Sequence, residues 1–294
     1  MTTSSAPGAG GTRTIVFVHG LWLSSASWRA WRERFEARGH TTLAPEWPGM
    51  EEPLPVLRER YRGTGRRSDV GLTEVVDACA RVVAGLPEQP VLVGHSFGGL
   101  VVQLLLDRGL GSAGVAISPA SVKGVNQLPL STLRSGWAVL RTPANRHRTV
   151  ALTKAQWHYA FANTLSRSAS DALWEEHWAP TPGRPLWQAA TAALSSRPAN
   201  AVDLTARDRP PLLVHANGAD HTVPASLSRA VHAVQSRTGA VTEIHEFPGR
   251  PHLSALVDGW EAVADDALEW ALRFPVRPGG AGRAGLSGAR RAGG

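Results

Sequence analysis

The sequence is poor in features that mark secreted or membrane proteins. Its 294 residues include one cysteine, Cys79, so no intramolecular disulfide can form. It contains no run of about 18 consecutive apolar residues, which a transmembrane helix would need. The first residues, MTTSSAPGAGGTRT, lack the charged start and apolar stretch of a secretory signal peptide. We therefore expect a cytoplasmic protein that is not associated with a membrane.

Acidic residues are missing from the middle of the chain. No Asp or Glu occurs from Ser118 to Ser170, a stretch that nevertheless contains Lys123, Arg134, Arg141, Arg146, Arg148, Lys154 and Arg167. This basic stretch suggests an anionic substrate or an acidic partner, such as a phosphopantetheine-bearing carrier, unless Glu175 and Glu176 neutralise it. The net charge of the chain is +7, but no nucleic-acid-binding motif accompanies it. We interpret the positive charge as a solubility feature and expect no nucleic-acid partner.

Short apolar strands alternate with helices along most of the chain. Strands are predicted at 14–20, 41–47, 90–96, 114–120, 211–218 and 241–247, and helices at 27–39, 100–109, 224–237 and 254–273. The predicted strands are apolar on both faces, which is typical of a mostly parallel sheet covered by helices on both sides. The sequence therefore predicts an α/β fold.

The alternation is interrupted between two of these strands. Residues 121–205 contain amphipathic segments without a clear strand, so we predict a helical cap inserted into a core made of 14–120 and 206–274. The ends, 1–13 and 275–294, are rich in Gly, Ala, Ser and Arg and are predicted to be disordered.

The strongest chemical signal is the pentapeptide Gly94-His95-Ser96-Phe97-Gly98, which matches G-x-S-x-G between a predicted strand and a predicted helix. In that context the serine lies on a tight turn that exposes its hydroxyl at the end of the sheet. The following helix directs its positive N-terminus at the site. We predict that Ser96 is a catalytic nucleophile.

A serine nucleophile requires a base and an orienting carboxylate. His252, in FPGRPHLS, follows the last predicted strand and is the preferred base, with His221 as its competitor. Asp220, in HANGADHTVP, follows the penultimate strand and is the preferred acid. His95 is expected to point away from the nucleophile, and Asp258 is expected to lie inside the last helix.

An oxyanion hole requires two backbone N–H donors. We predict that Phe97 provides one and Leu21 the other, with Trp22 as the alternative to Leu21. Aromatic residues of the cap could form an apolar pocket. The candidate pocket residues are Trp22, Trp157, His158 and Phe161.

The segments FVHGLWLSSASW, APEWPG, LVGHSFGG, GADHTVP and GRPHLS resemble members of the α/β-hydrolase superfamily of the esterase and lipase type. The resemblance covers residues 14–273 and implies the fold, the Ser-Asp-His triad and the oxyanion donors. The triad predicts cleavage of a carboxylic ester through an acyl-enzyme without a cofactor, and thioester, lactone and amide cleavage would use the same groups. The aromatic cap residues favour a substrate with an apolar acyl or aryl group. No metal-ligand spacing such as H-E-x-x-H occurs.

Two other functions remain open at this point. The same fold could host a non-hydrolytic enzyme, such as a lyase, a cofactor-free oxygenase or a cyclase. It could also serve as a binding protein without chemistry. The sequence gives no indication of the oligomeric state.

Overall fold

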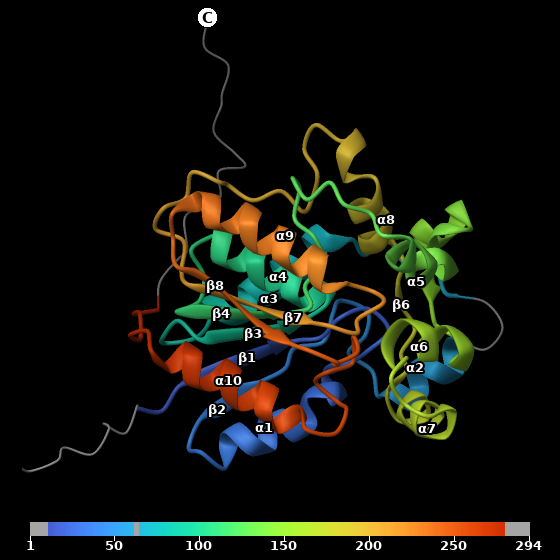
Figure 1. Ribbon diagram of the computed structural model, residues 1–294, viewed down its shortest axis with the longest axis horizontal. Coiled ribbons are helices and arrows are strands. Elements are labelled where there is room, and N and C mark those ends of the chain that lie inside the picture. The colour runs from blue at the N-terminus through green and yellow to red at the C-terminus, as the bar shows by residue number, and fades with distance from the viewer. Residues whose placement is uncertain (1–10, 62–64, 280–294) are drawn as a thin grey trace, which may run out of the picture.

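The computed structural model describes residues 11–61 and 65–279. Its main sheet has six strands in the order β2-β1-β3-β4-β7-β8, all of them parallel (Figure 1). The strands are β1 (Thr14–Val18), β2 (Thr41–Leu43), β3 (Val91–His95), β4 (Ala113–Ile117), β7 (Leu212–Asn217) and β8 (Thr242–Phe247). The predicted α/β fold class is therefore confirmed.

Helices cover both faces of this sheet. One face packs against α1 (Arg29–Glu36) and α10 (Trp260–Leu272), and the other against α3 (Leu72–Ala84), α4 (Phe97–Asp107) and α9 (Ala225–Gln235) (Figure 1). Successive strand residues point to opposite faces, so Ile15 and Phe17 join the α1/α10 core while Val16 and Val18 join the other. The double-sided burial explains why the strands are apolar throughout.

Residues 121–205 contain α5 (Leu130–Leu140), α6 (Lys154–Phe161), α7 (Arg167–His177) and α8 (Arg184–Ala190), which lie to one side of the sheet with α2 (Leu54–Tyr61) (Figure 1). Two short strands that the sequence analysis did not predict, β5 (Thr149–Val150) and β6 (Thr181–Pro182), pair antiparallel there. Two residues are too few to show a strand period. Short 3-10 helices complete the described elements: η1 (Ser25–Trp28), η2 (Pro143–His147), η3 (Ala192–Leu194) and η4 (Ser236–Thr238).

The two ends of this inserted segment are hydrogen-bonded to each other. The Lys123 N–H donates to the Asn200 carbonyl at 3.0 Å, and the Asn200 Nδ2 donates to the Ser121 carbonyl at 3.0 Å. The insertion therefore leaves and rejoins the core at one place, between the neighbouring strands β4 and β7.

Two local expectations differ from the structure. Helix α10 begins at Trp260 rather than at 254, so Asp258 precedes the helix. Residues 275–279 of the tail predicted to be disordered lie against 86–89, where the Gln89 N–H donates to the Arg277 carbonyl at 2.9 Å. Backbone pairing, which composition does not reveal, holds this segment. Residues 1–10 and 280–294 lie outside the described residues.

None of the helices within the described ranges is both long and apolar enough to cross a lipid bilayer.

Candidate active site

Ser96 lies on the turn between β3 and α4 with φ 56° and ψ −118°. A positive φ is strained for a serine and indicates a conformation that the surrounding structure enforces. A Cβ on Gly94 would come within 2.2 Å of the Gly98 carbonyl oxygen, and one on Gly98 within 2.0 Å of the Val18 carbonyl oxygen. Both glycines of the motif are therefore required by the close backbone packing of this turn.

His252 and Asp220 form a buried pair on two neighbouring loops, after β8 and β7. The Nδ1 of His252 lies 2.7 Å from Oδ2 of Asp220, and both side chains are fully buried. The other oxygen, Oδ1, accepts hydrogen bonds of 2.7 Å from the backbone N–H groups of Thr222 and Val223. The carboxylate is thus fixed through both oxygens, and because a carboxylate can only accept, Nδ1 of His252 is the donor in this pair.

The second ring nitrogen of His252 faces no acceptor or donor. Its Nε2 is buried and makes no hydrogen bond with any described residue, the Ser96 hydroxyl included. In unliganded enzymes the hydrogen bonds between catalytic groups are often long and tighten only with substrate. Nε2 is therefore the one nitrogen of this ring that is available to take a proton.

The side chain of His95 lies against His252, and no hydrogen bond among the described residues joins it to the Ser96 hydroxyl. Its ring lies 4.6 Å from that of His252, centroid to centroid, and its Nε2 donates a 2.8 Å hydrogen bond to the His252 carbonyl. Burial, together with the neighbouring His252, holds the pKa of His95 well below its ordinary value. His95 is therefore a neutral donor that supports the loop of His252, a role that the sequence pattern did not reveal.

His221, the competing base, is held by the inserted segment. Its Nδ1 lies 3.0 Å from the carbonyl oxygen of Tyr159, and its ring lies 4.7 Å from the Tyr159 ring. The structure thus pairs Asp220 with His252 and occupies His221 elsewhere.

The predicted oxyanion donors lie on two turns that touch. A Cβ on Gly20 would come within 2.9 Å of the His95 carbonyl oxygen and of the Ser96 Cβ. Neither the Leu21 N–H nor the Phe97 N–H has an acceptor among the hydrogen bonds of the described residues. Trp22, the alternative donor, gives its N–H to Thr181 Oγ1 at 3.1 Å. Leu21 and Phe97 are therefore the pair with free N–H groups.

His19 contacts the backbone of the turn that carries Leu21. His19 lies 2.9 Å from the Gly20 carbonyl oxygen through Nδ1 and 3.2 Å from Glu46 Oε2 through Nε2, and it stacks on Trp47. Burial raises the pKa of Glu46, but contacts with His19 and Ser25 outweigh burial and hold that pKa below its ordinary value. The motifs of the sequence did not predict this support, although His19 lies in the segment FVHGLWLSSASW.

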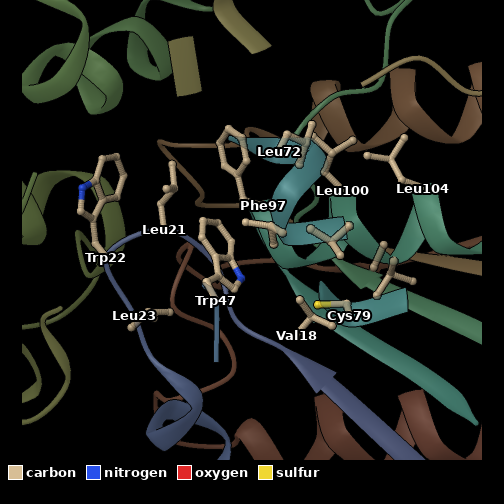
Figure 2. Packing of buried hydrophobic residues seen from close by; sticks show 14 of the residues in the cluster. Val18, Leu21, Trp22, Leu23, Trp47, Leu72, Cys79, Phe97, Leu100 and Leu104 are labelled. Carbon is tan, nitrogen blue, oxygen red and sulfur yellow. The ribbon is translucent and has the colours of Figure 1, made fainter. Parts of the chain in front are cut away.

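Three of the four candidate pocket residues form one aromatic group, which contacts His252 through Phe161. The Phe161 ring lies 4.9 Å from His252, 5.8 Å from Trp22 and 4.8 Å from Trp157, and all three aromatic residues are buried. The side chains of Leu21, Trp22 and Phe97 point the same way from their turns (Figure 2). His158, the fourth candidate, has no ring contact with this group among the described residues. The group lies beside a closed site, in which Ser96 is only 4% exposed.

The basic stretch of the insertion is partly neutralised. Lys154 lies 2.7 Å from Glu175 and Arg167 3.8 Å from Asp171, while Glu176 pairs instead with Arg29 at 2.9 Å. Arg134 lies 3.8 Å above the Tyr159 ring. An anionic substrate or acidic carrier stays a prediction for this face.

Comparison with known proteins gives the same family as the motifs. The model of the alpha/beta hydrolase family matches residues 15–266. No curated protein matches this sequence.

Solved structures share the fold at low identity. Polyneuridine aldehyde esterase is 15% identical with a TM-score of 0.60, over 89% of this chain and 100% of that one. The Paleococcus ferrophilus monoacylglycerol lipase is 22% identical with a TM-score of 0.60, over 90% and 96%. Tomato methylketone synthase I, in a variant bound to beta-ketoheptanoate, is 15% identical with a TM-score of 0.60, over 90% and 98%.

Proposed function

The chain belongs to the alpha/beta hydrolase family, and from this premise we propose that it is a serine hydrolase that cleaves a carboxylic ester through an acyl-enzyme on Ser96. The observation that carries the proposal is the buried His252–Asp220 pair, whose free Nε2 lies in the loop that packs on the turn of Ser96. A thioester or a lactone would react through the same groups.

In the proposed mechanism Ser96 Oγ bonds to the acyl carbon while His252 Nε2 takes the hydroxyl proton. The N–H groups of Leu21 and Phe97 stabilise the negative oxygen of the tetrahedral intermediate. The C–O bond to the alcohol then breaks, and His252 returns the proton to the leaving oxygen. Water repeats the sequence on the acyl-enzyme and releases the acid. Asp220 keeps the imidazole in the required orientation throughout.

The substrate that fits this proposal has an apolar acyl or aryl group. On the cap side His252 contacts the ring of Phe161, which in turn packs against the rings of Trp22 and Trp157. Rings of this kind bind apolar groups through the area they bury. The chemistry needs no cofactor, because the side chains supply the nucleophile, the base and the electrostatic stabilisation.

The test is a panel of p-nitrophenyl esters and acyl thioesters of increasing chain length, combined with fluorophosphonate labelling. Ser96→Ala should abolish labelling and lower kcat by a factor on the order of 10⁶. Ser118→Ala is the matched control, because Ser118 follows β4 as Ser96 follows β3 and also has a positive φ, 42°. The control should keep labelling and turnover, and equal losses in both variants would refute the assignment of Ser96.

Labelling of Ser96 without turnover of any ester would instead favour a non-hydrolytic enzyme, such as a lyase, cofactor-free oxygenase or cyclase. The observation behind this second candidate is the closure of the site, since Ser96 is 4% and His252 0% exposed, and hydrolysis requires water at the acyl-enzyme. A pure binding protein would show ligand affinity that Ser96→Ala leaves intact and no activity to lose.

A further inference from the structure

Two histidines face the same side of neighbouring strands, away from the candidate active site. His215 of β7 and His245 of β8 are partners in the parallel register. Their rings are stacked, with centroids 6.2 Å apart and an interplanar angle of 15°. Helix α10 packs over this face of the sheet and places Asp266 against both rings.

The nitrogens of both rings converge on one carboxylate oxygen. His215 Nε2 lies 2.9 Å and His245 Nδ1 lies 2.8 Å from Asp266 Oδ2. One ligand atom from each of the three side chains lies within 4.8 Å of the others. A zinc ion at its usual bond lengths holds neighbouring tetrahedral ligands about 3.3 Å apart. To enclose such an ion, the two nitrogen–oxygen distances would have to lengthen by about half an ångström. The two ring nitrogens, which lie within 4.8 Å of each other, would have to approach by up to about 1.5 Å.

We propose that His215, His245 and Asp266 form a binding site for a divalent transition metal ion, with zinc as the ion that fits best. Two imidazoles and one carboxylate are a ligand set that zinc accepts. The side chains of His245 and Asp266 are 35% and 33% exposed, so an ion can enter from solvent and keep a water molecule as its fourth ligand.

The two ring nitrogens that face Asp266 carry protons in this arrangement, because a carboxylate oxygen can only accept the hydrogen bonds from His215 and His245. A metal ion would take the place of these two protons. Each ring would then keep its single proton on the nitrogen that faces away from Asp266.

The neighbouring carboxylate of Glu243 does not join the three proposed ligands. Glu243, two residues before His245 on β8, forms an ion pair with Arg273 at 3.0 Å and lies 3.9 Å from His245 Nε2, the nitrogen that faces away from Asp266. A carboxylate on that side matches the usual outer partner of a metal-bound histidine. Glu243 would therefore orient the ring without binding the ion.

The role of the ion would be structural. It would connect the edge strand β8 to β7 and to α10. The loop of Asp220 follows β7, and the loop of His252 joins β8 to α10. Ligand binding to the folded state raises stability by mass action, so zinc should raise the unfolding temperature. The metal-site proposal does not depend on the chemistry of Ser96. Fluorophosphonate labelling tests Ser96 and zinc binding tests the metal site, so either proposal can fail without the other.

The experiment uses the full chain without an affinity tag. Zinc is titrated in competition with a chromogenic chelator, cobalt(II) is added to look for the visible absorption of a tetrahedral site, and thermal unfolding is followed with and without zinc. The variants are His245→Ala and Asp266→Asn. The matched control is His147→Ala, because His147 pairs with Asp69 at 2.7 Å without a second histidine.

The wild-type chain should bind one zinc ion, show the cobalt absorption and gain thermal stability. Both variants should bind at least tenfold more weakly and lose the zinc-dependent gain, whereas the control should match the wild type. The proposal is overturned if the wild type binds no stoichiometric zinc, if the two variants bind zinc as tightly as the wild type, or if the control weakens binding as much as they do. If one variant does not fold, the other variant locates the site.

Discussion

Two clusters of two histidines and one aspartate lie next to the same sheet, one at its carboxyl edge and one between β7, β8 and α10, and their hydrogen bonds are arranged differently. At the carboxyl edge only His252 contacts Asp220, while His95 donates to the backbone of His252. Beneath α10 both His215 and His245 contact Asp266. The same residue types therefore form a chain of contacts at the carboxyl edge, from His95 to His252 to Asp220. Beneath α10 both histidines contact one shared carboxylate.

The difference in connection determines what each cluster can do. At the carboxyl edge one oxygen of Asp220 is held by two backbone N–H groups, and the His252 nitrogen distant from Asp220 remains free. That arrangement suits movement of one proton. Around Asp266 three ligand atoms converge on a small volume, which suits a cation. Residue type alone therefore does not assign either function.

The largest expected effect separates the two carboxylates. Asp220→Asn should lower kcat for an activated ester by a factor on the order of 10⁴, because an amide stabilises the wrong tautomer of the base. Asp266→Asn in zinc-free protein should lower kcat by less than a factor of about ten, because it contacts neither Ser96 nor His252. Steady-state kinetics on both variants measure this, and equal losses would contradict the division of roles.

A second comparison uses the backbone beneath the serine. Gly98→Ala would place a Cβ 2.0 Å from the Val18 carbonyl oxygen, so we expect destabilisation of about 3 kcal/mol and loss of Ser96 labelling. Gly136→Ala in α5 meets nothing closer than 3.5 Å and should stabilise the protein by roughly 0.5–1 kcal/mol. Chemical denaturation checks both. A Gly98→Ala protein as stable as wild type would show that the turn is not tightly constrained.

The smallest expected effect concerns pH. His95 has a lowered pKa when folded, whereas the unfolded chain protonates this ring near pH ~6.5. Below that pH the unfolded state binds more protons, so stability should fall by up to ~1.4 kcal/mol per pH unit for this residue until the folded pKa is reached. His215 has the same direction of shift and adds to the slope.

Unfolding free energies measured between pH 7.5 and 5.5 test this linkage. His95→Gln removes the titration and leaves a side chain that can donate to the His252 carbonyl, so its stability should depend less steeply on pH than that of the wild type. An unchanged slope would show that His95 does not contribute.

The sequence predicted the strands and the Ser96 turn because those features are local. Apolar runs ending in glycine and a G-x-S-x-G turn are recognisable within ten residues. The pairing of Asp220 with His252 was inferable because parallel strands end at one edge, so the loops after β7 and β8 must be neighbours. The roles of these residues in catalysis stay predictions.

Other features depend on distances that the sequence does not contain. The contact of His95 with the His252 carbonyl spans 157 residues and depends on the direction of one side chain. The His215, His245 and Asp266 cluster combines two strands and a helix, so its spacing matches no local metal motif. The tail segment at 275–279 is held by backbone hydrogen bonds, and residue composition does not reveal whether a segment forms them.

The closed base of the inserted segment has a practical consequence for engineering. Because Ser121 and Lys123 are hydrogen-bonded to Asn200, the two splice points are already adjacent in space and lie between neighbouring strands. Chain closure therefore tolerates a segment of another length, since closing a longer loop adds only about 0.6 kcal/mol per doubling of length. An exchanged segment would still have to replace the hydrogen bonds that this one makes with Trp22, His221 and Leu253.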